Sequence, residues 1–112
     1  MSNKIKVWLR DILQAIREIE SFIADISSLE QYQLDVKTRR AVERNVAIVG
    51  EAMNKIRKEE PEISITSIRE IVHTRNLVIH AYDRVSNQII WSIVKESLPI
   101  LKSEVETILK DR

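Results

Sequence analysis

Residues 68–84 read IREIVHTRNLVIHAYDR and contain both histidines of the chain. Apolar residues recur in this stretch at the spacing of an α-helix, which predicts one buried stripe. The stripe consists of Ile68, Ile71, Val72, Val78 and Ile79. Arg75 falls inside it, seven residues after its start. Because an unpaired charge is costly to bury, the pattern predicts a helix whose arginine is paired or serves a purpose.

A polar stripe runs beside the apolar one, formed by Arg69, His73, Asn76 and His80. Tyr82 follows two residues after the last of these. One interpretation is structural, since arginines at helix edges often extend to water or pair with a carboxylate. The other is a reactive site, because one helix edge would carry a cation, an amide, imidazoles and a phenol.

The composition indicates one all-α domain over residues 1–112. With one glycine and two prolines, the chain has few of the residues that make the turns of a β protein. The net charge of +1 creates no global basic field, so any binding of nucleic acid must use local patches. Cysteine is absent, which excludes disulfides and thiolate chemistry. We expect a cytoplasmic protein, because no segment is typical of a signal peptide or a membrane span.

The expected architecture is an antiparallel four-helix bundle. Apolar residues at steps of three and four predict a long first helix over residues 4–31, which at ~40 Å would exceed what one small core needs. Another subunit is expected to cover part of its apolar face. Asp35 is the expected N-cap of a second helix over residues 36–58. Its predicted buried face is Val42, Val46, Val49, Met53 and Ile56.

The second helix also has polar and small residues with open interpretations. Its first turns are basic, through Lys37, Arg39, Arg40 and Arg44, which is either a solvated face or a rim that contacts phosphate. Gly50 and Ala47 form a notch of small residues, so another helix is expected to approach closely there. Glu51 is either a partner for Arg75 or an exposed carboxylate.

Prolines divide the rest of the chain. Pro61 ends the second helix, and Ser64 or Thr66 is expected to cap the third. Ser86 is the expected N-cap of a last helix, which Pro99 should kink near residues 95–98. Its predicted inward residues are Ile89, Ile90, Ile93, Val94, Leu98, Leu101, Val105 and Ile108.

Arg75, His80 and Tyr82 together reproduce the spacing R-x4-H-x-Y. This pattern resembles the signature of HepT-like toxins, which belong to the HEPN superfamily of all-helical ribonucleases. The segment from Ile48 to Ala52, IVGEA, is similar to the I-x-G-E-A segment of that family. Asn76 after the arginine is also similar to the family pattern, as are Ile90-Trp91 and Leu98-Pro99.

The resemblance implies a function and a set of site residues. It implies an endoribonuclease toxin that needs no metal, with Arg75 and His80 as catalytic residues in the cleft of a homodimer. Asn76 and Glu51 would support them. It also implies a cognate MntA-like nucleotidyltransferase antitoxin, which inactivates such toxins by adenylylating the tyrosine that stands here as Tyr82. RNA is the implied substrate.

The chemistry of these side chains is consistent with RNA cleavage. Histidine has a reference pKa of ~6.5 and exchanges protons near neutral pH, while arginine clamps a phosphate and stays charged. Arg75 and His80 are five residues apart, so on a straight helix they point about 140° away from each other. A two-fold dimer would solve this by facing two such helices across a cleft. A metal site is disfavoured, because His73 and His80 are seven residues apart with no close carboxylate.

Two other functions stay open on the sequence alone. One is a non-catalytic HEPN accessory module that binds a nucleotide or a partner protein, which the modest net charge favours. The other is a helical dimer with a structural role only. His73 is expected to be structural or to face solvent, because the family pattern does not require it.

Overall fold

The computed structural model describes residues 1–66, 68–80 and 86–111, and residues 77–80 by the course of their helix alone. Every regular element in these ranges is helical, which confirms the all-α expectation. The elements are α1 (Asn3–Phe22), α2 (Leu29–Leu34), α3 (Val36–Glu59), α4 (Ile68–His80), α5 (Asn87–Ser92), the π-helical turn η2 (Ile93–Ser97) and α6 (Leu98–Asp111). None of these helices is both long and apolar enough to cross a lipid bilayer.

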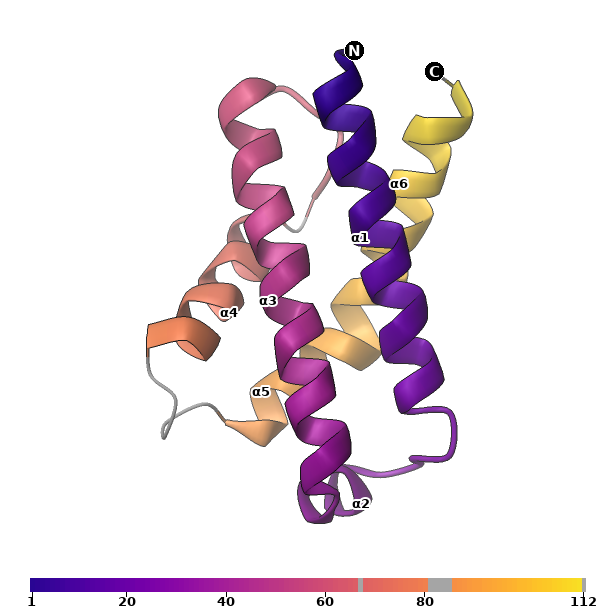
Figure 1. Cartoon of the computed structure of the whole chain (residues 1–112), viewed down its shortest axis with the longest axis vertical. Helices are drawn as coiled ribbons and strands as arrows, with labels where there is room; N and C mark the ends of the chain where they lie inside the picture. The colour runs from indigo at the N-terminus through magenta and orange to yellow at the C-terminus, as the bar shows by residue number, and fades with distance from the viewer. Residues whose placement is uncertain (67, 81–85, 112) are drawn as a thin grey trace.

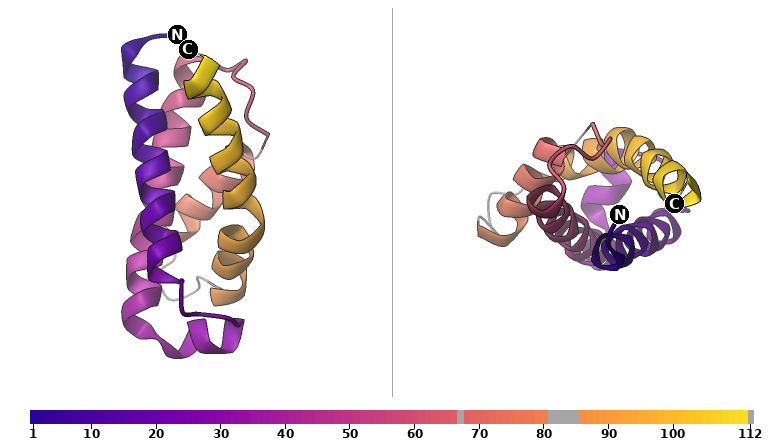
Figure 2. Two further views of the ribbon diagram at one scale, coloured as in Figure 1. Left: turned by 90° about the vertical axis from the view of Figure 1, so that its right-hand side faces the viewer. Right: turned by 90° about the horizontal axis from the view of Figure 1, so that it is seen from above.

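Three long rods form the body of the bundle. α1 and α3 lie side by side and run in opposite directions, and the segment from α5 through α6 returns beside α1 (Figure 1). Both chain termini lie at the same end of the molecule in the side views of Figure 1 and the left panel of Figure 2. The shorter α4 packs on the outer side of α3. This placement leaves one flank of α4 at the margin of the bundle.

The first helix ends earlier than the sequence predicted. α1 stops at Phe22, and a turn separates it from α2, so the expected single helix over residues 4–31 is wrong. A second helix start at Ser28 is the physical reason why residues 29–31 do not belong to the first helix. The hydroxyl of Ser28 accepts a hydrogen bond from the Gln31 amide at 3.2 Å and so begins a new helix in a new direction. Apolar periodicity continued through this break, because the residues of the turn still contact the core.

The start of α3 agrees with the sequence prediction. Asp35 accepts hydrogen bonds from the amide of Thr38 at 3.0 Å and from its hydroxyl at 2.7 Å. These bonds lower the pKa of the Asp35 carboxyl, the backbone bond having the larger effect. The predicted inward residues of α3 are all buried, and they pack on α1 through Leu9, Ile12, Ile16 and Ile19.

The C-terminal helical segment forms a π-turn where Pro99 was expected to kink it. Proline has no amide proton and its ring crowds the carbonyl four residues earlier, so a regular α-turn cannot form there. The chain instead makes the π-turn η2, in which the Leu98 amide donates to the carbonyl of Ile93. Most of the predicted inward residues of this rod are buried. Ile108 is half-buried, and Ile89 is 45% exposed because it lies at the edge of that face, in a hollow beside α4.

Among the described residues, two polar contacts tie α4 to the rest of the bundle. Ser97 in η2 donates a hydrogen bond to the Glu70 carboxylate at 3.3 Å. On the other flank, Arg75 forms an ion pair with Glu51 of α3. Ile71 and Val72 are buried between these contacts, as the apolar stripe predicted. The helix therefore has a fixed rotation about its axis, and that rotation decides where Arg75 points.

Candidate functional site: the Arg75 clamp on helix α4

Arg75 leaves α4 at the point where this helix comes closest to α3. A side chain at Gly50 would overlap Cβ of Arg75, and its Cβ would lie 2.8 Å from Cγ of Arg75. The notch of small residues expected at Gly50 is therefore a real close approach of two helices. The apolar part of the arginine fills the notch, which explains why a charged residue stands on the apolar stripe.

The guanidinium of Arg75 is held by two acceptors. Its Nη2 atom donates to the Glu51 carboxylate, and its Nη1 donates to Oδ1 of Asn76 at 2.8 Å. The Arg75 side chain is 21% exposed and that of Glu51 is 40% exposed, so the pair lies at the protein surface. Of the two interpretations that the sequence left open for Glu51, the structure shows the pairing with Arg75, and three of the expected site residues come together here.

The arginine retains hydrogen-bonding capacity in this arrangement. A guanidinium has five N–H donors, and the two bonds from Nη1 and Nη2 engage only two of them. Its Nε is buried without an acceptor among the described residues. The remaining Nη donors are available to an incoming anion, and phosphate oxygens suit the fork of a guanidinium well.

His80 is the last residue of α4. The helix is continuous from Ile68 through His80, so positions 75 and 80 lie on faces of one regular helix about 140° apart and about 7.5 Å apart along its axis. The side chain of His80 and the whole of Tyr82 lie outside the described residues. His73, one turn before Asn76, is exposed, in agreement with a solvent-facing residue.

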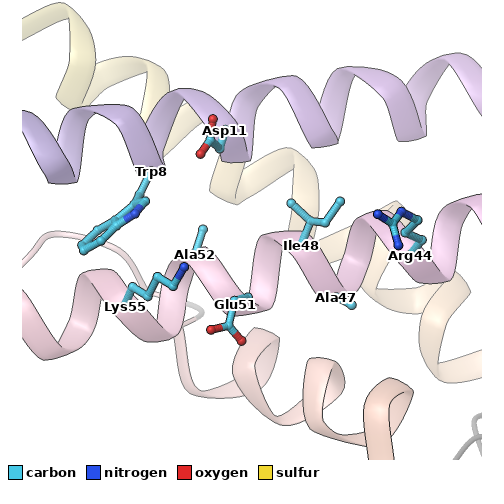
Figure 3. Close-up of a pocket in the computed structure, with 8 residues that line it drawn as sticks. All are labelled: Trp8, Asp11, Arg44, Ala47, Ile48, Glu51, Ala52 and Lys55. Carbon is cyan, nitrogen blue, oxygen red and sulfur yellow. The ribbon is translucent and has the colours of Figure 1, made fainter.

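A hollow of about 430 Å³ adjoins the Arg75 pair and separates the exposed edges of α1 and α3. Figure 3 shows Ile48 and Ala52 directed from α3 toward α1, while the Glu51 carboxylate points from α3 toward α4. The rim carries Asp11, Arg44, Glu51 and Lys55, and Trp8 forms one wall. Sequence reasoning did not find this hollow, because no local pattern shows which flank of α1 meets which flank of α3.

Comparison with known proteins identifies the family. The sequence profile described as "Ribonuclease HepT-like" matches residues 12–108. The chain belongs to the HepT-like family. This membership confirms the resemblance inferred from the motif around Arg75 and His80, and it agrees with the all-α fold.

Individual relatives of this HepT-like chain match along nearly their whole length. A protein of Thermococcus cleftensis named as a ribonuclease HepT is 38% identical, over 98% of this chain and 100% of the relative. A protein of Methanocaldococcus jannaschii named as an RNase is 33% identical, over 93% of this chain and 95% of the relative. One of Caldanaerobacter subterraneus, also named as an RNase, is 33% identical over 92% of each chain. No solved structure matches the chain at a significant level.

Proposed function

We propose that this HepT-like chain is an endoribonuclease toxin that cleaves RNA without a metal ion, in the cleft of a homodimer. The observation that carries the proposal is the position of the Arg75 guanidinium. Glu51 and Asn76 hold it at the surface, and these two bonds leave further N–H donors of the guanidinium for a phosphate. The membership of the chain in a family described as ribonucleases supports RNA as the substrate.

The proposed reaction is transesterification within the RNA chain. The 2′-hydroxyl loses its proton and attacks the adjacent phosphorus, so that a new P–O bond forms while the bond to the 5′-oxygen breaks. The leaving oxygen takes up a proton, and the products end in a 2′,3′-cyclic phosphate and a 5′-hydroxyl. Arg75 neutralises the charge that develops on the phosphate oxygens. His80 transfers protons, because imidazole exchanges them near neutral pH.

A second copy of the chain completes the site. Arg75 and His80 point in widely different directions on one helix, so a single α4 presents them poorly to one phosphate. Two α4 helices related by a two-fold axis bring the arginine of one protomer toward the histidine of its partner. The proposal therefore includes a composite site in which each protomer supplies part of the chemistry.

The test is cleavage of a fluorescent RNA by purified protein in the presence of EDTA. Wild-type protein is expected to cleave under these conditions. His80→Ala and Arg75→Ala should each lower kcat/KM about 10²-fold or more, because each removes a group that acts in the transition state. His73→Ala is the matched histidine control and should leave the rate unchanged. Activity that requires a divalent metal, or that survives both substitutions, contradicts the mechanism and favours a non-catalytic module.

We also propose that an MntA-like nucleotidyltransferase antitoxin inactivates the toxin by adenylylating Tyr82. An AMP group would bring a phosphate anion to the neighbourhood of Arg75 and add bulk in front of the cleft. The spacing of Tyr82 from Arg75 and His80 supports this proposal.

Mass spectrometry tests the modification. Incubation with the cognate nucleotidyltransferase, ATP and Mg²⁺ should add one or more increments of about 329 Da. Tyr82→Phe should receive no increment. Tyr32→Phe is the control and should receive the same increments as wild type, because Tyr32 is fully buried. A mass increment that persists in Tyr82→Phe, or modified protein that cleaves at the rate of unmodified protein, would contradict inhibition through this residue.

A further inference from the structure

Gly50 is the single glycine of the chain, and it lies buried in the middle of α3. A glycine inside a helix costs about 1 kcal/mol relative to alanine, so its presence needs a reason. The reason is not backbone conformation, because none of the described residues has a positive φ. What the position requires is the absence of a side chain. An added Cβ would overlap Cβ of Arg75 and would lie 3.1 Å from the carbonyl oxygen of Ile71.

The residue of α4 that occupies this space is Arg75 itself. The contacts of the missing Cβ are with Cβ and Cγ of the arginine, the atoms at the root of its side chain. Cβ cannot move away as the end of a flexible chain would, because it is bonded directly to the α4 backbone. Gly50 therefore determines how closely Cβ of Arg75 approaches α3. The position of Cβ in turn determines where the side chain that carries the guanidinium begins.

Glu51 acts on the other end of the same side chain. It accepts a hydrogen bond from Nη2 of Arg75, while Asn76 accepts from Nη1 at 2.8 Å. Two bonds from two different nitrogens set the plane of the guanidinium. With side chains 21% and 40% exposed, the ion pair lies where such pairs contribute little to stability. Its main consequence is orientation, since a free arginine side chain samples many rotamers.

We propose that Gly50 and Glu51 are positioning residues for the phosphate clamp, Gly50 by seating the root of Arg75 and Glu51 by setting the plane of its guanidinium. The inference rests on the ribonuclease function proposed above. In this arrangement the arginine is ordered before RNA binds, so its ordering does not reduce the binding free energy. Neither residue needs to touch the substrate.

The first experiment is a substitution series at Glu51, with kcat and KM measured separately. Glu51→Ala removes the acceptor and should lower kcat/KM about 10-fold or more, as expected when a catalytic group is misplaced. Glu51→Gln keeps an acceptor oxygen and should remain within about threefold of wild type, a rescue by hydrogen bonding alone. Glu59→Ala is the matched control, because Glu59 lies on the same helix as Glu51, is 44% exposed and forms a surface ion pair with Lys4 of α1 at 3.2 Å. It should leave kcat/KM unchanged.

The second experiment asks whether these residues act through Arg75. Gly50→Ala should lower kcat/KM about 10-fold or more in the wild-type background and cause no further loss in Arg75→Ala, because the effects of residues that act as a unit are not additive. Free guanidinium ion, at concentrations that do not unfold the protein, should partly restore the activity of Arg75→Ala. It should fail to do so in Arg75→Ala/Glu51→Ala, which lacks the carboxylate that holds the ion. A structural role would not produce this dependence on Glu51.

The outcomes separate this inference from the proposed function. If Arg75→Ala cleaves RNA at the wild-type rate, the proposed function fails and the inference fails with it. If Arg75→Ala is inactive while Glu51→Ala and Gly50→Ala cleave normally, the function stands and the positioning roles are wrong. If Gly50→Ala does not fold, the Glu51 series and the guanidinium rescue still test whether the orientation of Arg75 is needed for cleavage.

Discussion

At the scale of single residues, the structure shows which polar groups the fold leaves without partners. Tyr32 of α2 is completely buried, and its ring packs on Trp91 with centroids 5.2 Å apart. Its hydroxyl has no hydrogen-bond partner among the described residues. Burial raises the pKa of the Tyr32 phenol, the nearby Glu43 carboxylate raises it further, and Arg39 acts in the opposite direction. The residue is thus held by its ring and not by its hydroxyl.

Removing the Tyr32 hydroxyl should therefore not destabilise the protein. A buried polar group without a partner costs about 1–3 kcal/mol, so Tyr32→Phe should leave the melting temperature unchanged or raise it. Tyr32→Ala should cost about 3–5 kcal/mol, because it removes the ring and leaves a cavity beside Trp91. Thermal unfolding followed by circular dichroism measures both. A loss of more than about 1 kcal/mol in Tyr32→Phe would show that the hydroxyl is satisfied after all.

At the scale of elements, α3 is the helix that organises the rest, since it contacts α1, α2, α4 and α5. Its start depends on the Asp35 cap, whose carboxyl pKa is lowered by the hydrogen bonds from Thr38. A group with a lowered pKa in the folded state contributes stability above its unfolded pKa, and this contribution is lost as the pH falls through the folded value. Asp35 thus links the stability of α3 to acid pH.

The pH dependence of this cap is testable with two variants. Asp35→Ala should lower the melting temperature at pH 7, and the difference from wild type should shrink as the pH falls below 3.8, the ordinary pKa of an aspartate carboxyl. Asp35→Asn is the control, because asparagine caps helices about as well and does not titrate. It should melt close to wild type at pH 7. Equal melting temperatures for wild type and Asp35→Ala at pH 7 would contradict a capping role.

At the scale of the whole molecule, the length of α1 gives no support to a homodimer. α1 ends at Phe22, so a first helix too long for its own core no longer supports a second subunit. The positions of residues 75 and 80 on different faces of α4 still do, because in the proposed reaction one phosphate must meet both groups. The proposed dimer therefore rests on the proposed catalysis and not on coverage of a long helix.

Sedimentation equilibrium checks the dimer. At micromolar protein the mass should be twice the 13.1 kDa of one chain. Mixing Arg75→Ala with His80→Ala should restore part of the activity if the site is composite, since mixed dimers then contain one intact site. Each variant alone provides the baseline. A monomer at tens of micromolar, or no recovery on mixing, would exclude the composite site.

The sequence by itself determined most of the local structure. Asp35 and Ser86 were identified as caps because a side-chain oxygen beside a helix start satisfies its free amides, whatever the rest of the fold does. The disturbance before Pro99 was equally local, since proline lacks the amide proton. The early end of α1 was missed, because the apolar pattern continues across a turn that still packs on the core.

Only the tertiary structure decided how the site is built. The sequence offered Glu51 as one possible partner of Arg75, but the contact depends on which flank of α3 meets α4 and in what register. Seventeen acidic residues are in the chain, and no local rule selects one of them for an arginine 24 positions away. The packing of Gly50 against Cβ of Arg75 brings the neighbouring Glu51 to the guanidinium, because helices approach most closely where a side chain is missing.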